Sequence, residues 1–310
     1  MKTRLTVILM MLVLCSSLSA FAAVSNSSVD QTKVSKIERY IYGDEQSGEA
    51  DARLNQLEED MFGHATAKPE IEKVKYLHDF IFKGATESPS LDMKLSFLEW
   101  KLFNHTGTGN LEARLADLDR QVIGNISNEP LAFRLEQLVH LTIENGLISL
   151  HRVRIPRGTE IKLVLGKSLS SRNARKDDLV QMTVADNLFV DRNILAMSKG
   201  GIISARIRNV RRGGRFGRTG YVNLQIRNIE SMDSTELPVE VAYAGMEKFD
   251  KKRIGMAAGA STLGYLVLGP IGIAGGAFVK GDDVEVPAGT EISVRTLQDT
   301  DVTGVLVHRK

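Results

Sequence analysis

Cysteine is nearly absent from this chain. The only one among the 310 residues is Cys15, which lies in an N-terminal segment with the features of a signal peptide. These features are a basic start, an apolar run and a small-residue cleavage site: Lys2 and Arg4, Leu5 to Leu14, and Ala20-Phe21-Ala22. Residues 1–23 are therefore predicted to be removed on export, most simply across a bacterial inner membrane. Leu14 is too large to precede a lipidated cysteine, so we expect no acyl anchor at Cys15. Because Cys15 is removed with the signal peptide, we expect a mature chain without disulfides or thiol chemistry.

Motifs for catalysis and metal binding are also missing. The segment 168–171 lacks the context of a nucleophile elbow, and the glycines of 211–220 follow a strand without opening a helix, unlike a phosphate-binding loop. His64 and His105 stand 41 residues apart, without the short spacing or flanking carboxylates of a ligand pair. The sequence therefore predicts a non-enzymatic role with no cofactor and no metal, and an enzyme that acts on the cell wall is only a third alternative.

Charge is unevenly divided along the chain. Residues 24–150 carry 13 Lys and Arg against 21 Asp and Glu, a net charge of −8, whereas residues 151–310 carry 25 against 17, a net charge of +8. Such asymmetry predicts two domains with different surfaces, divided near residue 150. Either the two halves attract one another, or the basic half faces an anionic partner.

The acidic half repeats every 20 or 21 residues. Each unit has apolar residues at helical spacing, as in "ARLNQLEEDMFG", and then a residue suited to a left-handed helix end. These end residues are Gly43, Gly63, Gly84, Asn104 and Gly124. Because a helix of about a dozen residues is marginal in isolation, the units are expected to pack as antiparallel hairpins.

The segments "LEEDMFG", "LEWKLFN" and "LEARLADLDRQVIG" resemble the L-E-x-x-[IVM]-F-G helical repeats of bacterial envelope proteins. The resemblance covers residues 33–145, and it bears on fold more than on function because the motif residues are mostly core-forming. Two roles stay open for this half of the chain. It is either a partner-binding array with an acidic face, or a stalk that acts as a spacer.

In the basic half, apolar and polar residues alternate. Five such segments predict half-buried antiparallel strands: 159–165, 178–185, 201–210, 221–229 and 237–243. The sequence "IPRGTEIKL" at 155–163 recurs as "VPAGTEISV" at 286–294. Because the two copies bracket the region, we expect the first and last strands to lie together and to close a barrel or sandwich.

Five landmarks in a fixed order carry a second resemblance: "IPRGTEIKLVLGKSLSS", "LAMSKGG", "GRFGRTGYVNLQIRNIES", "LPV", and a glycine-rich segment before "VPAGTEI". Over residues 153–297 the chain resembles a family of exported bacterial envelope β-domains. The resemblance implies location and architecture and supplies no catalytic residue. Two turns, in "RKDDLV" and "VDRNIL", lack the glycine expected there, which affects local turn geometry. Parts of the pattern are similar, more weakly, to the β-barrel of conjugation-type secretion channels.

The strongest charge feature is "ARIRNVRRGGRFGR". Its arginines are candidate contacts to an anionic surface: Arg206, Arg208, Arg211, Arg212, Arg215 and Arg218. Export argues against nucleic acid and leaves lipopolysaccharide, teichoic acid, phospholipid headgroups or cell-wall carboxylates as ligands. A purely structural interpretation also explains the spacing. It is a β-hairpin that turns at Gly213-Gly214 and alternates Arg206 and Arg208 on its outer face.

Residues 254–279, the glycine-rich segment, are 26 consecutive uncharged residues, and about 20 apolar residues span a bilayer. Small residues at spacings for close helix packing are candidate membrane or oligomer contacts: Gly255, Gly259, Gly264, Gly269, Pro270, Gly272 and Gly276. A single span would separate "VPAGTEISV" from the strand it should pair with. A glycine-zipper helical hairpin that turns at 268–271 is therefore predicted, which either packs against protein or dips into one leaflet.

The sequence thus predicts an α+β multidomain protein of the periplasm or cell envelope. Its parts are a signal peptide (1–23), an acidic helical repeat domain (24–150) and a basic antiparallel β-barrel or sandwich (151–310) with the inserted hairpin. The predicted role is structural or interactive, with membrane association through the hairpin. The alternative is a periplasmic adaptor for an anionic envelope polymer or a secretion-type complex. Envelope proteins are the expected partners, nucleic acid is not, and a homo-oligomer stays open.

Overall fold

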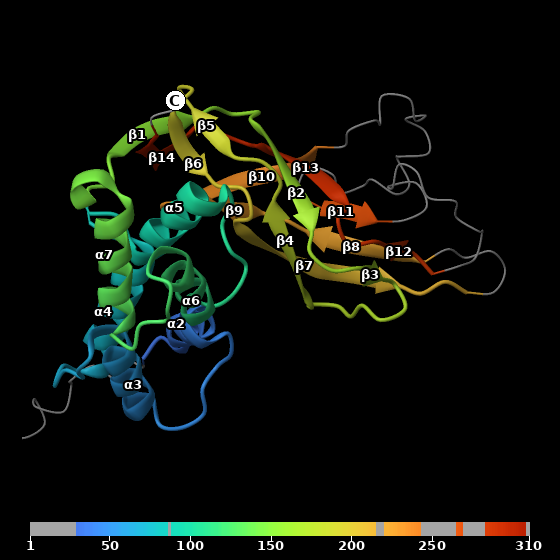
Figure 1. Ribbon diagram of the computed structural model, residues 1–310. Coiled ribbons are helices and arrows are strands. Elements are labelled where there is room, and N and C mark those ends of the chain that lie inside the picture. The colour runs from blue at the N-terminus through green and yellow to red at the C-terminus, as the bar shows by residue number, and fades with distance from the viewer. Residues whose placement is uncertain (1–28, 86–87, 215–219, 243–264, 269–282, 308–310) are drawn as a thin grey trace, which may run out of the picture.

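The computed structural model describes residues 29–85, 88–214, 220–242, 265–268 and 283–307. Helices form the first part of the described chain and antiparallel sheets form the second, so the fold is α+β (Figure 1). The helices end at Thr142, and the first strand begins at Leu150. The predicted order of a helical half and a β half is confirmed.

The helical array consists of α2 to α7, followed by a single 3₁₀ turn, η1. Its elements are α2 (Gln31–Tyr42), α3 (Ala50–Phe62), α4 (Glu70–Phe82), α5 (Leu91–Phe103), α6 (Leu111–Val122), α7 (Leu131–Thr142) and η1 (Glu144–Gly146). Gly63 and Asn104 adopt the left-handed conformation that ends α3 and α5. Helices that are distant in sequence also pack together, since α2 contacts α4 and α6 and α3 contacts α7. The array is therefore a compact bundle with one apolar core.

Buried ion pairs join successive helices of the array at a fixed spacing. A carboxylate on one helix pairs with a base in the first turn of the next helix, 15 residues later. The pairs are Glu38–Arg53, Glu58–Lys73, Glu99–Arg114 and Asp119–Arg134, with N–O distances of 2.5, 3.5, 2.8 and 2.7 Å. We call this series the ion-pair ladder. The acids are at most 3% exposed, so each pair has little access to water.

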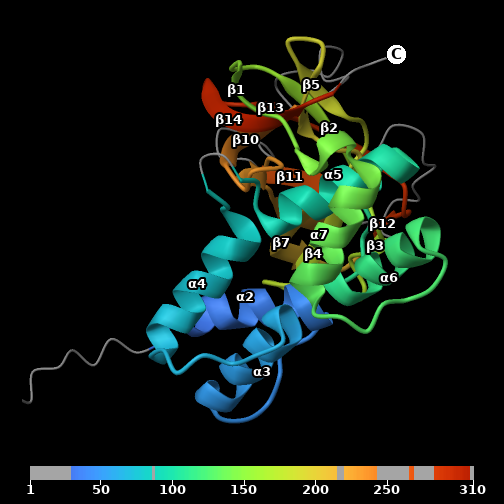
Figure 2. The same cartoon turned by 60° about the vertical axis from the view of Figure 1, so that its left-hand side comes forward.

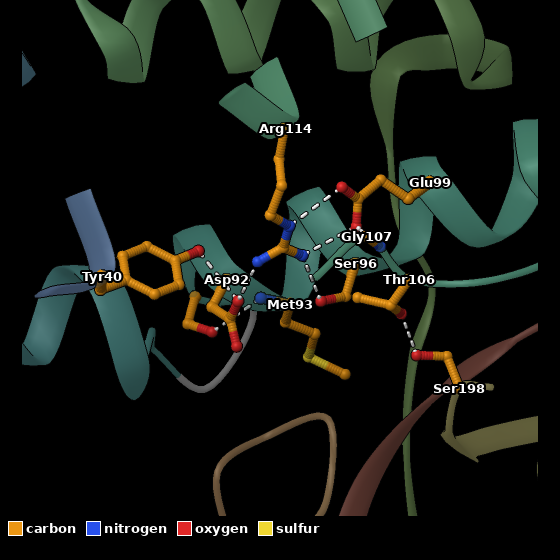
Figure 3. A network of polar contacts seen from close by, with 10 residues as sticks. Tyr40, Asp92, Met93, Ser96, Glu99, Thr106, Gly107, Arg114 and Ser198 are labelled. Carbon is orange, nitrogen blue, oxygen red and sulfur yellow. Dashed lines mark hydrogen bonds and ion pairs between the residues drawn. The ribbon is translucent and has the colours of Figure 1, made fainter. Parts of the chain in front are cut away.

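Each ladder acid also accepts a hydrogen bond from the loop that follows its helix. The donors are backbone N–H groups eight residues after the acid: Gln46, Thr66, Gly107 and Ser127. Figure 3 shows one such site, where the Arg114 guanidinium lies between Glu99 and Asp92. One buried carboxylate thus fixes both a loop and the next helix. Removing such a partner would leave the other charge buried and unpaired.

In the β-domain, residues 150–307, the described residues form two main sheets and one short ribbon. The first sheet has the order β1 (Leu150–Ile155), β14 (Thr300–Leu306), β6 (Ile194–Met197) and β5 (Leu188–Val190). The second has the order β11 (Tyr265–Leu268), β8 (Tyr221–Gln225), β7 (Ile202–Arg211), β4 (Leu179–Val184), β2 (Glu160–Leu165), β13 (Glu291–Thr296), β10 (Glu236–Ala242) and β9 (Asn228–Glu230). The ribbon pairs β3 (Leu169–Ser170) with β12 (Glu285–Val286). Buried apolar side chains of the two main sheets form one core.

The repeated Pro-x-Gly-Thr-Glu-Ile sequences start β2 and β13, and these two strands are antiparallel neighbours. This confirms that the first and last copies lie together. The two copies are related by an approximate two-fold axis, because the Gly158 N–H donates to Thr296 O and the Gly289 N–H donates to Leu165 O, both at 2.8 Å. The flanking strands follow the same symmetry, since β1 pairs with β14 and β3 with β12. Two interlocked copies therefore form the centre of the β-domain.

The four-stranded sheet separates the two cores. Its strand β6 has the sequence Ile-Leu-Ala-Met, in which all four residues are buried. Ile194 and Ala196 belong to the core of the β-domain, whereas Leu195 belongs to the core of the helical array. A strand covered on both faces does not alternate apolar and polar residues. In both views α5 lies against this sheet (Figure 1, Figure 2).

A hydrogen bond, an aromatic contact and an ion pair also cross this interface. The Thr106 N–H donates to Lys199 O at 2.7 Å, and the Trp100 ring meets Phe189 edge-on at 6.1 Å. Lys36 pairs with Glu230 at 3.6 Å, with the base on the helical side. The centre of the interface is apolar. In this ion pair the base comes from the acidic half of the chain and the acid from the basic half.

Two turns of the β-domain that lack the expected glycine still adopt left-handed backbone conformations. Asp177 has φ +70° in "RKDDLV", and Asp191 and Arg192 have φ +50° and +67° in "VDRNIL". Aspartate tolerates this region better than most residues, whereas an arginine there is unusual. In both turns, residues other than glycine adopt the positive φ.

The prediction of a helix over the glycine-rich segment is wrong for the four residues of it that the structure describes. Tyr265–Leu268 form the strand β11, which pairs antiparallel with β8. Their sequence, Tyr-Leu-Val-Leu, is rich in β-formers, and β8 offers an edge for pairing. The other residues of 254–279 lie outside the described residues.

Candidate functional site

The described candidate arginines lie on β7 and just after it. This strand starts beside the helical array, where Lys199 O accepts from the Thr106 N–H, and runs away from the helices (Figure 1). Strands β7 and β8 pair antiparallel, with Arg211 opposite Tyr221, as the predicted hairpin requires. Arg206, Arg211 and Arg212 are exposed, and Arg208 is partly buried. Arg215 and Arg218 lie outside the described residues.

Arg206 is exposed and Arg208 partly buried, on either side of the buried Ile207, and the alternation of β7 changes beyond Arg208. The register of β7 shifts between Ile207 and Asn209, which places Arg208 in a β-bulge. A bulge adds one residue to a strand and reverses its alternation beyond that point. Consequently Val210 packs against the core and Arg211 faces outward over the Tyr221 ring, at 4.8 Å.

Asp283 anchors the base of this hairpin, a role that the sequence did not reveal. Its carboxylate accepts hydrogen bonds from the Gly213 N–H at 2.8 Å and the Ser171 hydroxyl at 2.9 Å, and it pairs with Arg172 at 3.0 Å. The bond from Gly213, followed by those from Arg172 and Ser171, lowers the pKa of the Asp283 carboxyl. One carboxylate thus ties the turn after β7, the end of β3 and the start of β12 together.

Replacing Asp283 with asparagine is expected to destabilise the β-domain in a pH-dependent way. A carboxyl whose pKa is lowered on folding contributes stability above its unfolded pKa, about 3.9, and that contribution is lost as the pH falls through the lower folded value. The melting temperature of the wild type should therefore exceed that of Asp283→Asn near neutral pH, and the difference should shrink in acid. Glu285→Gln, at an exposed neighbour, is the matched control. A difference that is constant from neutral pH to strong acid would contradict this role.

Strands of the β-domain flank the glycine-rich segment on both sides. Strand β10 precedes the segment and β12 follows it, and β11 within it lies beside β8 of the arginine hairpin. The candidate glycines and Pro270 all lie outside the described residues. Their predicted contact with membrane or another subunit stays a prediction.

Exposed acids gather at the other end of the molecule, around the loop between α2 and α3. Members of this group are Asp44, Glu45, Glu49, Asp51 and Glu59, all of them exposed. They lie on the part of the array that points away from the β-domain (Figure 1, Figure 2). The molecule therefore presents an acidic end and an end with exposed arginines.

Within the described ranges, no helix is long and apolar enough to cross a membrane. Nor do the described His, Asp, Glu and Cys side chains include a group of three or more that could hold a metal ion. No known family model and no curated protein matches the chain. The interpretation of its function consequently depends on the geometry and charge given above.

Proposed function

We propose that this chain is an exported, non-catalytic envelope protein that links an envelope surface to protein partners. In this proposal the end of the β-domain with the arginine hairpin and the glycine-rich segment contacts the membrane, and the helical array faces a protein partner. The observation that carries the proposal is the position of that segment. Its described part, β11, pairs with β8, the strand that pairs with the arginine-bearing strand β7.

The pairing of the flanking strands limits how the glycine-rich segment could meet a bilayer. Strand β10, before the segment, pairs with β13, and β12, after it, pairs with β3. Since both flanks are held in one folded domain, the segment has to return to the side from which it leaves. This favours insertion into one leaflet or packing on protein over a single transmembrane span.

Cell fractionation tests this role. The comparison is between the full chain and a variant in which residues 254–264 and 269–279 are replaced by Gly-Ser linkers of equal length. Tyr265–Leu268 are kept so that β8 retains its neighbour. If the proposal is correct, the full chain stays with the membranes after a carbonate wash and the variant is released. Release of both proteins would contradict membrane anchoring.

A second candidate function is that of a periplasmic adaptor for an anionic envelope polymer, favoured by the exposed arginines. Replacing Arg206, Arg211 and Arg212 with serine is expected to weaken binding to liposomes of anionic phospholipid at low salt. Salt should weaken the binding of the wild type in the same way, because exposed charges are screened. Arg154→Ser, at an exposed arginine on β1 in the other sheet, serves as the control. Unchanged binding of the triple variant would exclude an anionic-surface role for these arginines.

A further inference from the structure

The ion-pair ladder is interrupted between α4 and α5. In α3, α5 and α6 the ladder acid is the ninth residue of the helix: Glu58, Glu99 and Asp119. In α4 the ninth residue is His78, and the acid follows one position later as Asp79. One residue of an α-helix turns the side chain by about 100°. Asp79 therefore leaves the ladder face and pairs with Lys75 and Lys83 on its own helix, at 3.4 and 3.0 Å.

The base of this interrupted step is still present. Lys94 is the fourth residue of α5, just as the ladder bases Lys73 and Arg114 are the fourth residues of α4 and α6. Because α4 has no acid at the ladder position, the Lys94 ammonium pairs with Glu136 on α7. The side chain of Lys94 is 15% exposed, as is that of the ladder base Arg53. The junction thus has a ladder base whose usual partner is missing.

A cavity of about 260 Å³ opens at this junction. Residues from α4, α5, α7 and the loop between α4 and α5 line it, among them Tyr76, Asp79, Phe80, Leu91, Lys94 and Glu136. Its wall is aromatic on α4, where the rings of Tyr76 and Phe80 stack at 6.1 Å, and Tyr76 is 47% exposed. The volume is below the roughly 300–1,000 Å³ of sites for drug-sized ligands. It suits one apolar side chain better than a cofactor.

The charged residues of the lining indicate which polar group of a ligand would lie beside that side chain. Asp79 and Glu136 offer hydrogen-bond acceptors and Lys94, which pairs with Glu136, offers donors, and all three line the same cavity. A free cation would meet the like charge of Lys94 there, and a free anion would meet the two carboxylates. A peptide group matches both the acceptors and the donors, because its N–H donates and its C=O accepts.

We propose that this cavity binds a peptide segment of a protein partner, with one aromatic or branched apolar side chain inside it and the adjacent peptide group between Asp79 and Lys94. The inference rests on the proposed interaction role of the helical array and names the chemistry that the array recognises. The interrupted ladder explains why the site lies at α4–α5, since the other four junctions of the array each have a buried ion pair.

The test is an NMR titration of isotope-labelled protein of residues 24–310 with N-acetyl-L-phenylalaninamide, a capped residue with one aromatic side chain. Saturable shifts are expected at the backbone amides of Gly84, Ala85 and Lys94. N-acetylglycinamide, which has the peptide groups but no side chain, should produce none. The proposal is overturned if the aromatic probe gives no saturable shift at these amides or if the glycine probe shifts them equally.

Two variants make the test specific to the cavity. Ala132→Phe places a ring in the lining, and His78→Glu supplies an acid at the ninth position of α4 and draws Lys94 away. Each should weaken binding of the aromatic probe by about tenfold or more, equivalent to about 1.4 kcal/mol. Ala52→Phe, at an exposed position of α3, should bind as the wild type does.

Circular dichroism verifies that each variant is folded, and Lys94→Met serves as a further variant of similar size without the charge. Wild-type affinity in Ala132→Phe, or in both His78→Glu and Lys94→Met, would overturn the proposal. None of these residues belongs to the β-domain. A failure here is therefore distinguishable from a failure of membrane anchoring in the fractionation experiment.

Discussion

Replacing Glu99 with alanine is expected to lower the free energy of unfolding by about 3–5 kcal/mol, because it leaves a buried guanidinium without its main partner. Arg114 is 6% exposed and donates to Glu99 at 2.8 and 2.9 Å. The substitution also removes the acceptor of the Gly107 N–H. Asp92, at 3.4 Å from Arg114, offsets part of the loss, which favours the lower end of the range. Urea unfolding followed by far-ultraviolet circular dichroism measures the effect.

An exposed ion pair on the next helix is the matched control for this variant. Asp117 pairs with Arg120 at 2.8 Å, and its side chain is 70% exposed, so Asp117→Ala should cost less than about 1 kcal/mol. The double variant Glu99→Ala/Arg114→Met should recover much of the loss, because it removes both buried charges. Equal costs for Glu99→Ala and Asp117→Ala would show that burial of the ladder contributes nothing.

Helix positions in the acidic half followed from the spacing of apolar residues, but the role of the charged residues did not. Glu58 directly follows the core residue Leu57, and Lys73 directly precedes Val74. Charged residues beside a core stripe are usually solvated, and Lys and Glu are rarely buried unless they are paired. The signal that could have revealed the ladder is the constant separation of 15 residues between acid and base. This separation indicates an ion pair only once it is known that the two helices pack against each other.

In the β-domain, the strands that alternate apolar and polar residues were predicted, and the sheet that contacts the helices was missed. Strand β6 is apolar throughout because Ile194 and Leu195 serve different cores. A short apolar run cannot be assigned to a strand or a helix from periodicity alone. The same ambiguity explains the wrong prediction at Tyr265–Leu268, where pairing with β8 decides the conformation.

The arginine hairpin shows a different limit of sequence reasoning. Its two strands were predicted, but the bulge at Arg208 depends on the register with β8. The anchoring role of Asp283 depends on contacts with Gly213, Ser171 and Arg172, which lie 70 or more residues away in the sequence. Such contacts follow from the topology of the sheet. Local propensity does not indicate them.

Replacing Leu195 with alanine is expected to destabilise the helical array and the β-domain together. Leu195 lies on β6, is fully buried and packs in the core of the helices. Truncating a buried leucine costs about 2–5 kcal/mol, through lost burial and the cavity left behind. Because the same strand contributes to both cores, we expect the two parts to unfold in one transition in the wild type and in the variant.

Trp100, the only tryptophan of the chain, allows a direct measurement because it contacts Phe189 across this interface. Tryptophan fluorescence and far-ultraviolet circular dichroism should give the same urea midpoint, and Leu195→Ala should lower both midpoints equally. Leu179→Ala, at a side chain that is 56% exposed on β4, should lower them by much less. Two separate transitions in the wild type would mean that the parts fold independently. In that case the shared strand β6 would position the helical array relative to the arginine hairpin without stabilising either.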